Sequence, residues 1–128
     1  MSNKFGLAAI DAVKFIQNGI ITNPIDAWNR ALLNYFDRNS SSYEKGCPRN
    51  AFLGLCEEGK IIGISSGSYT KSKKNKAYAI KAIKLLRNDP SLAEKTKVLW
   101  DMVVNWSGKA HNSQMDIVVA LWKENLIR

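Results

Sequence analysis

Apolar residues recur at helical spacing along almost the whole chain, and short polar breaks divide this pattern into segments. In the first segment the apolar residues fall on one helical face, and Asn18-Gly19 supplies a stop signal. The same period returns five more times. It predicts helices over residues 4–18, 24–36, 48–58, 72–87 and 92–106, and a last one after 112–113. We therefore expect an all-α fold, with about six helices in an irregular or orthogonal bundle.

Start and stop residues fix several of these boundaries. Asn23 is a good N-cap, and Pro24 suits a first helical position because its missing N–H costs nothing there. Gly59 is typical of a left-handed C-cap. The β-branched residues and serines that follow predict a short β arm near residues 60–69. A helix-turn-helix-like core is compatible with this order, although the connection is longer than the usual three or four residues.

Composition favours one folded unit. The 128 residues are 45% hydrophobic and contain no long low-complexity tract, so we expect a single helical domain over residues 1–128. Cys47 and Cys56 are nine positions apart around one predicted helix, which is too far for a disulfide, so reduced thiols are expected. The N-terminus lacks a basic-then-apolar leader, and no run of eighteen apolar residues occurs. We expect a cytoplasmic protein that does not contact membranes.

The net charge of +8 favours a polyanionic partner. Four lysines crowd the expected start of the helix over residues 72–87: Lys71, Lys73, Lys74 and Lys76. The positive end of a helix disfavours cations, so their position suggests a nearby anion. The alternative is that these lysines point into water, where the repulsion falls to a few tenths of a kcal/mol.

Neighbouring residues extend this candidate site. Arg49, Ser72 and Tyr69 could complete an anion site, and Tyr69 could stack on a base. The leading hypothesis is a non-enzymatic binding module that contacts nucleic-acid phosphates through residues 69–76. A helix pair with a solvated lysine face remains the competing interpretation.

A second group of polar residues could carry other chemistry. Cys47 precedes Pro48 at a helix start, and His111 could in principle serve as its base, which would suit a small Cys/His enzyme. Asn112 and Gln114 could hydrogen-bond a base or a peptide group. Ser113 and Asp116 have the spacing of a capping box. No metal-ligand spacing or cofactor motif occurs, so we expect neither a metal nor a cofactor.

The aromatic residues leave one further possibility open. All four tryptophans fall on expected core faces, but Trp106 lies at a helix end, where it could anchor a dimer. A protein-interaction module or homodimer is therefore the alternative to nucleic-acid binding.

Three strings carry a resemblance to a known family. They are KGCPRNAFLGLCEEG at 45–59, YTKSKKNKAYAIKA at 69–82 and HNSQMDIVVALW at 111–122. With them the chain resembles a family of small bacterial proteins described as a domain of unknown function. The resemblance implies a bacterial, single-domain, mostly helical protein, and it carries no activity or ligand.

Overall fold

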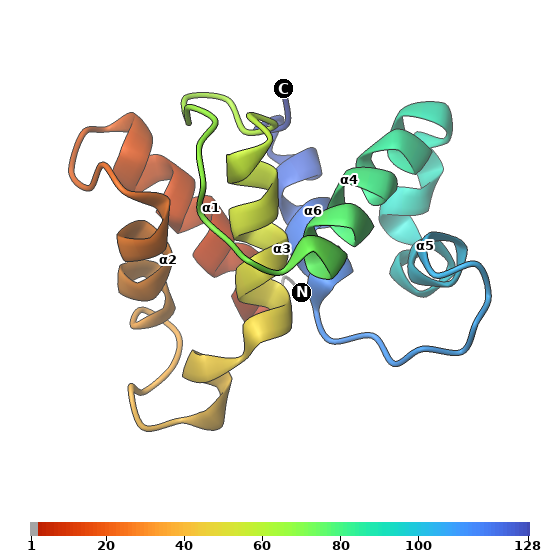
Figure 1. Cartoon of the computed structure of the whole chain (residues 1–128), viewed down its shortest axis with the longest axis horizontal. Helices are drawn as coiled ribbons and strands as arrows, with labels where there is room; N and C mark the ends of the chain where they lie inside the picture. The colour runs from red at the N-terminus through yellow and green to blue at the C-terminus, as the bar shows by residue number, and fades with distance from the viewer. Residues whose placement is uncertain (1–2) are drawn as a thin grey trace.

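The computed structural model describes residues 3–128, whose regular secondary structure is almost entirely helical (Figure 1). The all-α expectation is confirmed, while residues 1–2 of the expected domain lie outside the described part. The α-helices are α1 Lys4–Gln17, α2 Pro24–Leu32, α3 Gly46–Glu57, α4 Lys73–Asn88, α5 Thr96–Val103 and α6 Gln114–Lys123. Two 3-10 turns, η1 Ser41–Glu44 and η2 Pro90–Glu94, precede α3 and α5.

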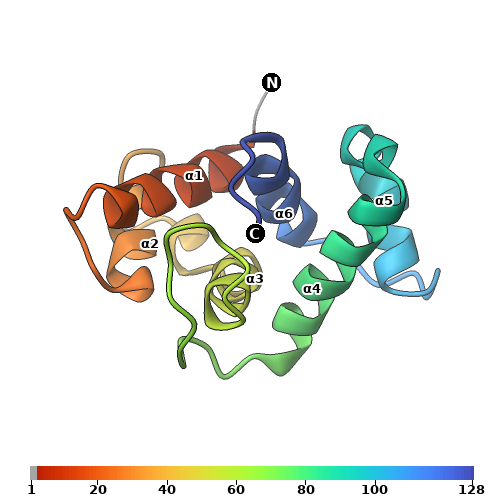
Figure 2. The same ribbon diagram turned by 90° about the horizontal axis from the view of Figure 1, so that it is seen from above.

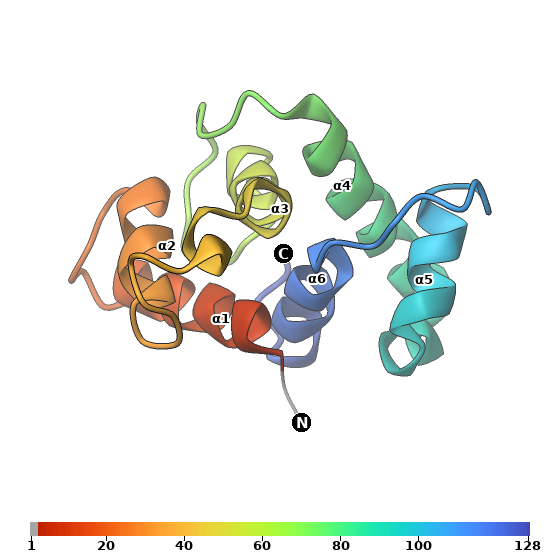
Figure 3. The ribbon, with the colours of Figure 1, turned by 90° about the horizontal axis from the view of Figure 1, so that it is seen from below.

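Helices α3 and α6 occupy the middle of the molecule (Figures 1 and 2). Helices α1 and α2 lie on one side of them, and α4 and α5 lie on the other. The segment before α6 runs from α5 back to the middle of the molecule, as Figure 3 shows from below. This route brings the start of α6 close to the start of α4.

The core is built from the apolar faces that the sequence pattern defines. Trp28 of α2 stacks on Phe52 of α3 with ring centroids 5.3 Å apart, and both side chains are fully buried. A glycine permits one of the closest helix contacts, because a Cβ on Gly6 of α1 would lie 2.8 Å from the Cβ of Ala120 in α6. Small residues thus set the spacing between helices, and large ones fill the space between them.

Most of the expected helix ends are confirmed. The Asn23 side chain accepts the N–H groups of Ile25 and Asp26 at 2.7 and 3.3 Å, and Pro24 opens α2. Ser72 caps α4, accepting the Asn75 N–H. Gly59 has the positive φ of +69° that a left-handed C-cap requires.

Two expected helices are shorter than predicted. Helix α2 ends at Leu32, and residues 33–35 continue as tight turns with bonds to the carbonyl three residues back. The segment expected as one helix over 92–106 divides at Lys95, whose φ of −130° separates η2 from α5. Periodicity alone misses such breaks because the apolar residues keep facing the core on both sides of them.

Three other expectations need correction or restatement. The β arm near residues 60–69 amounts to one antiparallel bridge, between Ile61 and Ile127. Residues 58–72 connect α3 to α4, which is longer than a helix-turn-helix connection. Trp106 does not lie in the core: it follows α5 with a φ of +57° and is 67% exposed, because the helix ends before its side chain can turn inward.

Candidate functional site

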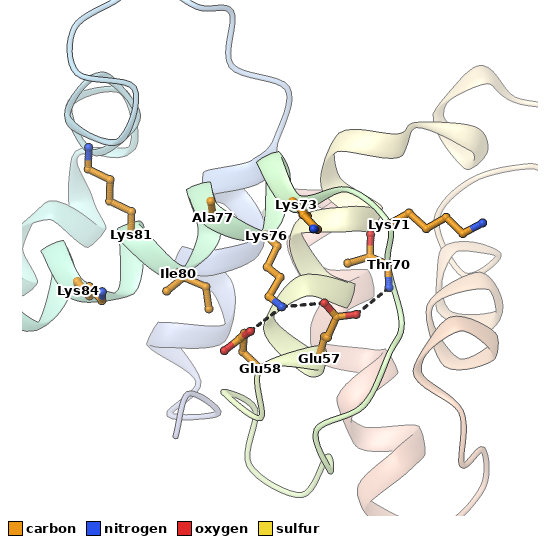
Figure 4. A pocket seen from close by; sticks show the side chains of 10 residues that line it. All are labelled: Glu57, Glu58, Thr70, Lys71, Lys73, Lys76, Ala77, Ile80, Lys81 and Lys84. Carbon is orange, nitrogen blue, oxygen red and sulfur yellow. Dashed lines mark hydrogen bonds and ion pairs between the residues drawn. The ribbon is translucent and has the colours of Figure 1, made fainter.

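Lys76, one of the lysines expected to bind an anion, is held inside the protein's own ion-pair cluster. Its Nζ lies 2.8 Å from Oε2 of Glu57 and 2.5 Å from Oε1 of Glu58 (Figure 4). Its backbone packs directly on α3, where a Cβ on Gly54 would lie 2.7 Å from the Lys76 Cα. Lys76 therefore holds α4 against the end of α3, and its charge is already matched.

Glu57 is the centre of this cluster. Its Oε1 accepts the backbone N–H groups of Tyr69 and Thr70 at 2.8 and 3.2 Å, in addition to the Lys76 contact. The hydrogen bond from Lys76 is the main reason that the pKa of Glu57 falls to about 2, and the two backbone donors add to the effect. Glu57 and the adjacent Glu58 both reach Lys76 because α3 ends at Glu57.

Tyr69, the expected stacking residue, is engaged within the loop. Its hydroxyl donates to the Ser65 carbonyl at 2.9 Å, and a Cβ on Gly67 would lie 2.7 Å from its ring. The next residue is fixed as well, since the Thr70 hydroxyl donates to Oδ1 of Asn50 at 2.8 Å. The loop before α4 is thus tied to α3 by side-chain and backbone bonds.

Lys76 and four other lysines line one open groove along α4, which we call the basic groove. The other four are Lys71, Lys73, Lys81 and Lys84, and the cavity volume is about 660 Å³. Ala77 and Ile80 give it an apolar floor (Figure 4). Within residues 3–128 none of these four lysines forms an ion pair. The groove is therefore a concave surface with uncompensated positive charge.

A second open groove, of about 630 Å³, lies beside the first. Arg49, Tyr69 and Ser72 line it, and Lys71 lines both grooves. The structure thus places these four predicted residues around one groove, with Arg49 on α3 and the other three before α4. Lys74 is not among them, because it points to the other side of the helix.

Lys74 lines a smaller cavity of about 320 Å³, which we call the polar pocket. Three of the secondary candidates, Cys47, Asn112 and Gln114, line it too. The remaining lining residues are Asn75, Tyr78, Trp100, Lys109 and Ala110. Residues that are distant in the sequence meet here because α3, α4 and α6 all begin at this pocket.

Gln114 organises the frame of the polar pocket. Its side chain is 3% exposed, accepts the Asn112 N–H at 2.7 Å and donates to Oδ1 of Asn75 at 3.2 Å. Asn75 in turn donates to the Ser72 hydroxyl at 3.1 Å. This chain of hydrogen bonds joins the first turns of α4 and α6, so their relative position is fixed.

His111 has a structural role that the sequence did not indicate. Its Nε2 accepts the Met115 N–H at 3.0 Å, and burial lowers its pKa. Ser113 adopts φ of +69° and makes no capping bond, so the expected Ser113–Asp116 capping box is wrong. The described residues contain no hydrogen bond between His111 and Cys47, so the geometry adds nothing to the Cys/His enzyme hypothesis.

The two thiols differ in their surroundings. Both cysteines are free, as expected. Cys56 is fully buried, and burial raises the pKa of its thiol, whereas Cys47 is half-buried at the polar pocket. Within residues 3–128 no three His, Cys, Asp or Glu side chains are grouped so that they could hold a metal ion.

Sequence reasoning missed several residues of these surfaces. The candidate site residues did not include Lys81, Lys84 or Tyr78. The spacing of Lys73, Ala77 and Lys84 could have shown that the basic face continues along α4. The inclusion of Lys109 and Trp100 in the polar pocket depends on the path of residues 104–113, which the sequence pattern does not define.

No described helix is long and apolar enough to cross a membrane.

Comparisons with known proteins give one match. The comparison with curated proteins gave no match, and neither did the comparison with solved structures. The model of a family of unknown function (DUF6979) matches residues 2–128. The chain therefore belongs to this family of unknown function.

Proposed function

We propose that this protein is a non-enzymatic binding module whose basic groove contacts the phosphates of a nucleic acid. The observation that carries the proposal is the set of four lysines, Lys71, Lys73, Lys81 and Lys84, which share one groove without ionic partners among the described residues. Glu57 and Glu58 also line this groove, but Lys76 contacts both of them. The net charge of the side chains that line the groove is therefore positive.

The shape of the groove suits a chain of phosphates better than a single anion. The lysines extend from the loop before α4 into the C-terminal half of that helix, and Figure 4 shows Lys71 and Lys84 pointing in different directions. Because α4 rises about 1.5 Å per residue, Lys73 and Lys84 are separated by roughly 16 Å along the helix axis. Arg49 in the adjacent groove extends the same surface through Lys71. A polyanion can contact several of these cations at once.

Fluorescence anisotropy tests the proposal with labelled single-stranded DNA, duplex DNA and RNA at two salt concentrations. Several neutralised phosphates predict a steep loss of affinity with salt. The test variant carries Gln at Lys71, Lys73, Lys81 and Lys84. The matched control carries Gln at four exposed cations elsewhere, Lys14, Arg30, Arg38 and Lys95, and therefore has the same net charge.

We expect the groove variant to lose at least about tenfold in affinity and to show a smaller salt slope than the control. Equal losses in the two variants would mean that only net charge matters, and the groove would be rejected. Absence of binding to all three nucleic acids at low salt would reject the function itself.

A protein-interaction role or homodimer is the second candidate, and the exposure of Trp106 favours it. This side chain is 67% exposed. Tryptophan is one of the residue types that contribute most to the binding energy of protein interfaces. Light scattering at rising concentration should show dimers that Trp106→Ala dissociates. A native protein that stays monomeric and captures no partner would exclude this candidate.

The setting of either function is also a proposal. We infer a cytoplasmic protein, since two unpaired thiols suit a reducing compartment. We infer a bacterial origin only from the family resemblance. Fractionation of cells expressing the protein would test the location.

A further inference from the structure

We propose that the polar pocket is a separate binding site for a small organic phosphate, independent of the nucleic-acid groove. The cavity of about 320 Å³ is within the size range of small-molecule sites. Its charged lining residues are Lys74 and Lys109, and no aspartate or glutamate among the described residues lines it. The pocket is therefore a concave site with charge of one sign.

The two lysines are gathered around one aromatic ring. Lys109 Nζ lies 5.9 Å from the centroid of Tyr78 and donates to its hydroxyl at 3.2 Å. Lys74 Nζ lies 6.0 Å from the same centroid. Neither lysine forms an ion pair within residues 3–128. Two like charges held together in a cleft repel each other, and a dianion between them would offset that cost.

Amide residues also line the wall of the pocket. The buried Gln114 side chain accepts the Asn112 backbone N–H and donates to Oδ1 of Asn75, so these two residues are held at the wall of the cavity. Helix α3 begins at the same wall and has no side-chain N-cap bond, whereas the Met115 N–H in the first turn of α6 is bonded to His111. The N-terminal N–H groups of α3 reinforce the preference for an anion that the two lysines establish.

An aromatic wall defines the rest of the ligand. Tyr78 and Trp100 form an edge-to-face pair with centroids 5.1 Å apart. The Trp100 indole donates to the Lys109 carbonyl at 2.8 Å, which fixes the segment that carries this lysine. A flat organic group can pack against this wall while its phosphate contacts the lysines. A phosphate monoester of a small aromatic group therefore matches the chemistry of the pocket.

The three strings that carry the family resemblance also meet here. They contribute Cys47, then Lys74, Asn75 and Tyr78, and finally Asn112 and Gln114. The basic groove draws no lining residue from the third string. The polar pocket is thus the surface on which all three strings are brought together.

Phenyl phosphate is the probe for the test, with benzyl alcohol as the uncharged control ligand. Its binding is followed by amide chemical shifts and by the rate at which iodoacetamide alkylates Cys47. Cys56 is fully buried, so alkylation of the folded protein reports Cys47. We expect millimolar or tighter binding that shifts the side-chain amides of Asn112 and Gln114 and slows alkylation, with no effect of benzyl alcohol.

Two variants test the lysines and the wall. Changing Lys74 and Lys109 to Gln should weaken phenyl phosphate binding by at least about tenfold, because hydrogen bonds between charged groups are stronger than those made by a neutral amide. The charge-matched control, Lys14→Gln with Lys95→Gln, should bind as the native protein does. Asn112→Asp places a carboxylate at the wall and should abolish binding, with folding checked by circular dichroism. Absent shifts and unchanged alkylation would overturn the proposal, as would equal weakening in the control.

Discussion

The two sides of the basic groove use the same residue type in opposite ways. On the inner side, next to α3, Lys76 contacts Glu57 and Glu58 and packs on Gly54, so its charge and its backbone are both part of the fold. On the outer side, Lys73 and Lys84 are exposed and have no ionic partner in the described part of the chain. A lysine cluster that looks uniform in the sequence therefore separates into a structural member and members free to bind.

The largest effect on stability is expected at Gly54, where α3 packs closely on α4. Gly54→Ala places a Cβ 2.6 Å from the Lys76 Cβ and 2.7 Å from its Cα, and backbone cannot move aside as a flexible side chain can. We expect a loss of about 2–3 kcal/mol in the free energy of unfolding, measured by urea denaturation. Gly46→Ala in the same helix is the control, since its Cβ would meet only Asn50 at 3.6 Å. Equal stability of the two variants would contradict the close packing of α3 on α4.

The second effect concerns pH. The pKa of Glu57 is about 2 in the folded protein and about 4.5 when unperturbed, so its ionised form stabilises the fold. This stability is present above pH 4.5 and is lost as pH falls toward 2. Thermal melts across this range should show Glu57→Gln less stable than the native protein at neutral pH and converging with it near pH 2. A constant difference at all pH values would show that the Glu57 charge is not linked to folding.

The third prediction compares a single lysine substitution on each side of the basic groove. Lys73→Gln should weaken nucleic-acid binding a few-fold and reduce the salt slope by about one, while the melting temperature stays unchanged. Lys76→Gln should lower the melting temperature, since it leaves two carboxylates without their cation, and should affect binding less. Anisotropy and thermal melts on both variants provide the comparison. If Lys76→Gln mainly weakened binding and Lys73→Gln mainly lowered the melting temperature, the roles given to these two lysines would be wrong.

The smallest effect tests the residue first expected to stack on a base. Tyr69→Phe removes the hydroxyl bond to the Ser65 carbonyl and should cost about 0.5–1 kcal/mol of stability. Affinity for nucleic acid should not change in Tyr69→Phe or in Tyr69→Leu, because the ring packs on Gly67. A loss of affinity confined to the Leu variant would restore Tyr69 as a stacking residue.

The sequence by itself determined the helical fold and most helix ends. Asn23 and Gly59 act where they were expected, because a cap depends on residues only two or three positions away. The helical period likewise assigned Trp28 correctly to the core. These signals are local, so they can be recognised without knowing which helices are neighbours.

Only the tertiary structure decided which polar residues are free. Lys76 differs from Lys73 because α3 places two carboxylates beside it, and His111 caps α6 because its ring reaches the Met115 N–H. The polar pocket joins Cys47, Lys74 and Gln114 because three helices begin at one place. Such relations depend on contacts between distant segments, and neither residue type nor spacing along the chain encodes them.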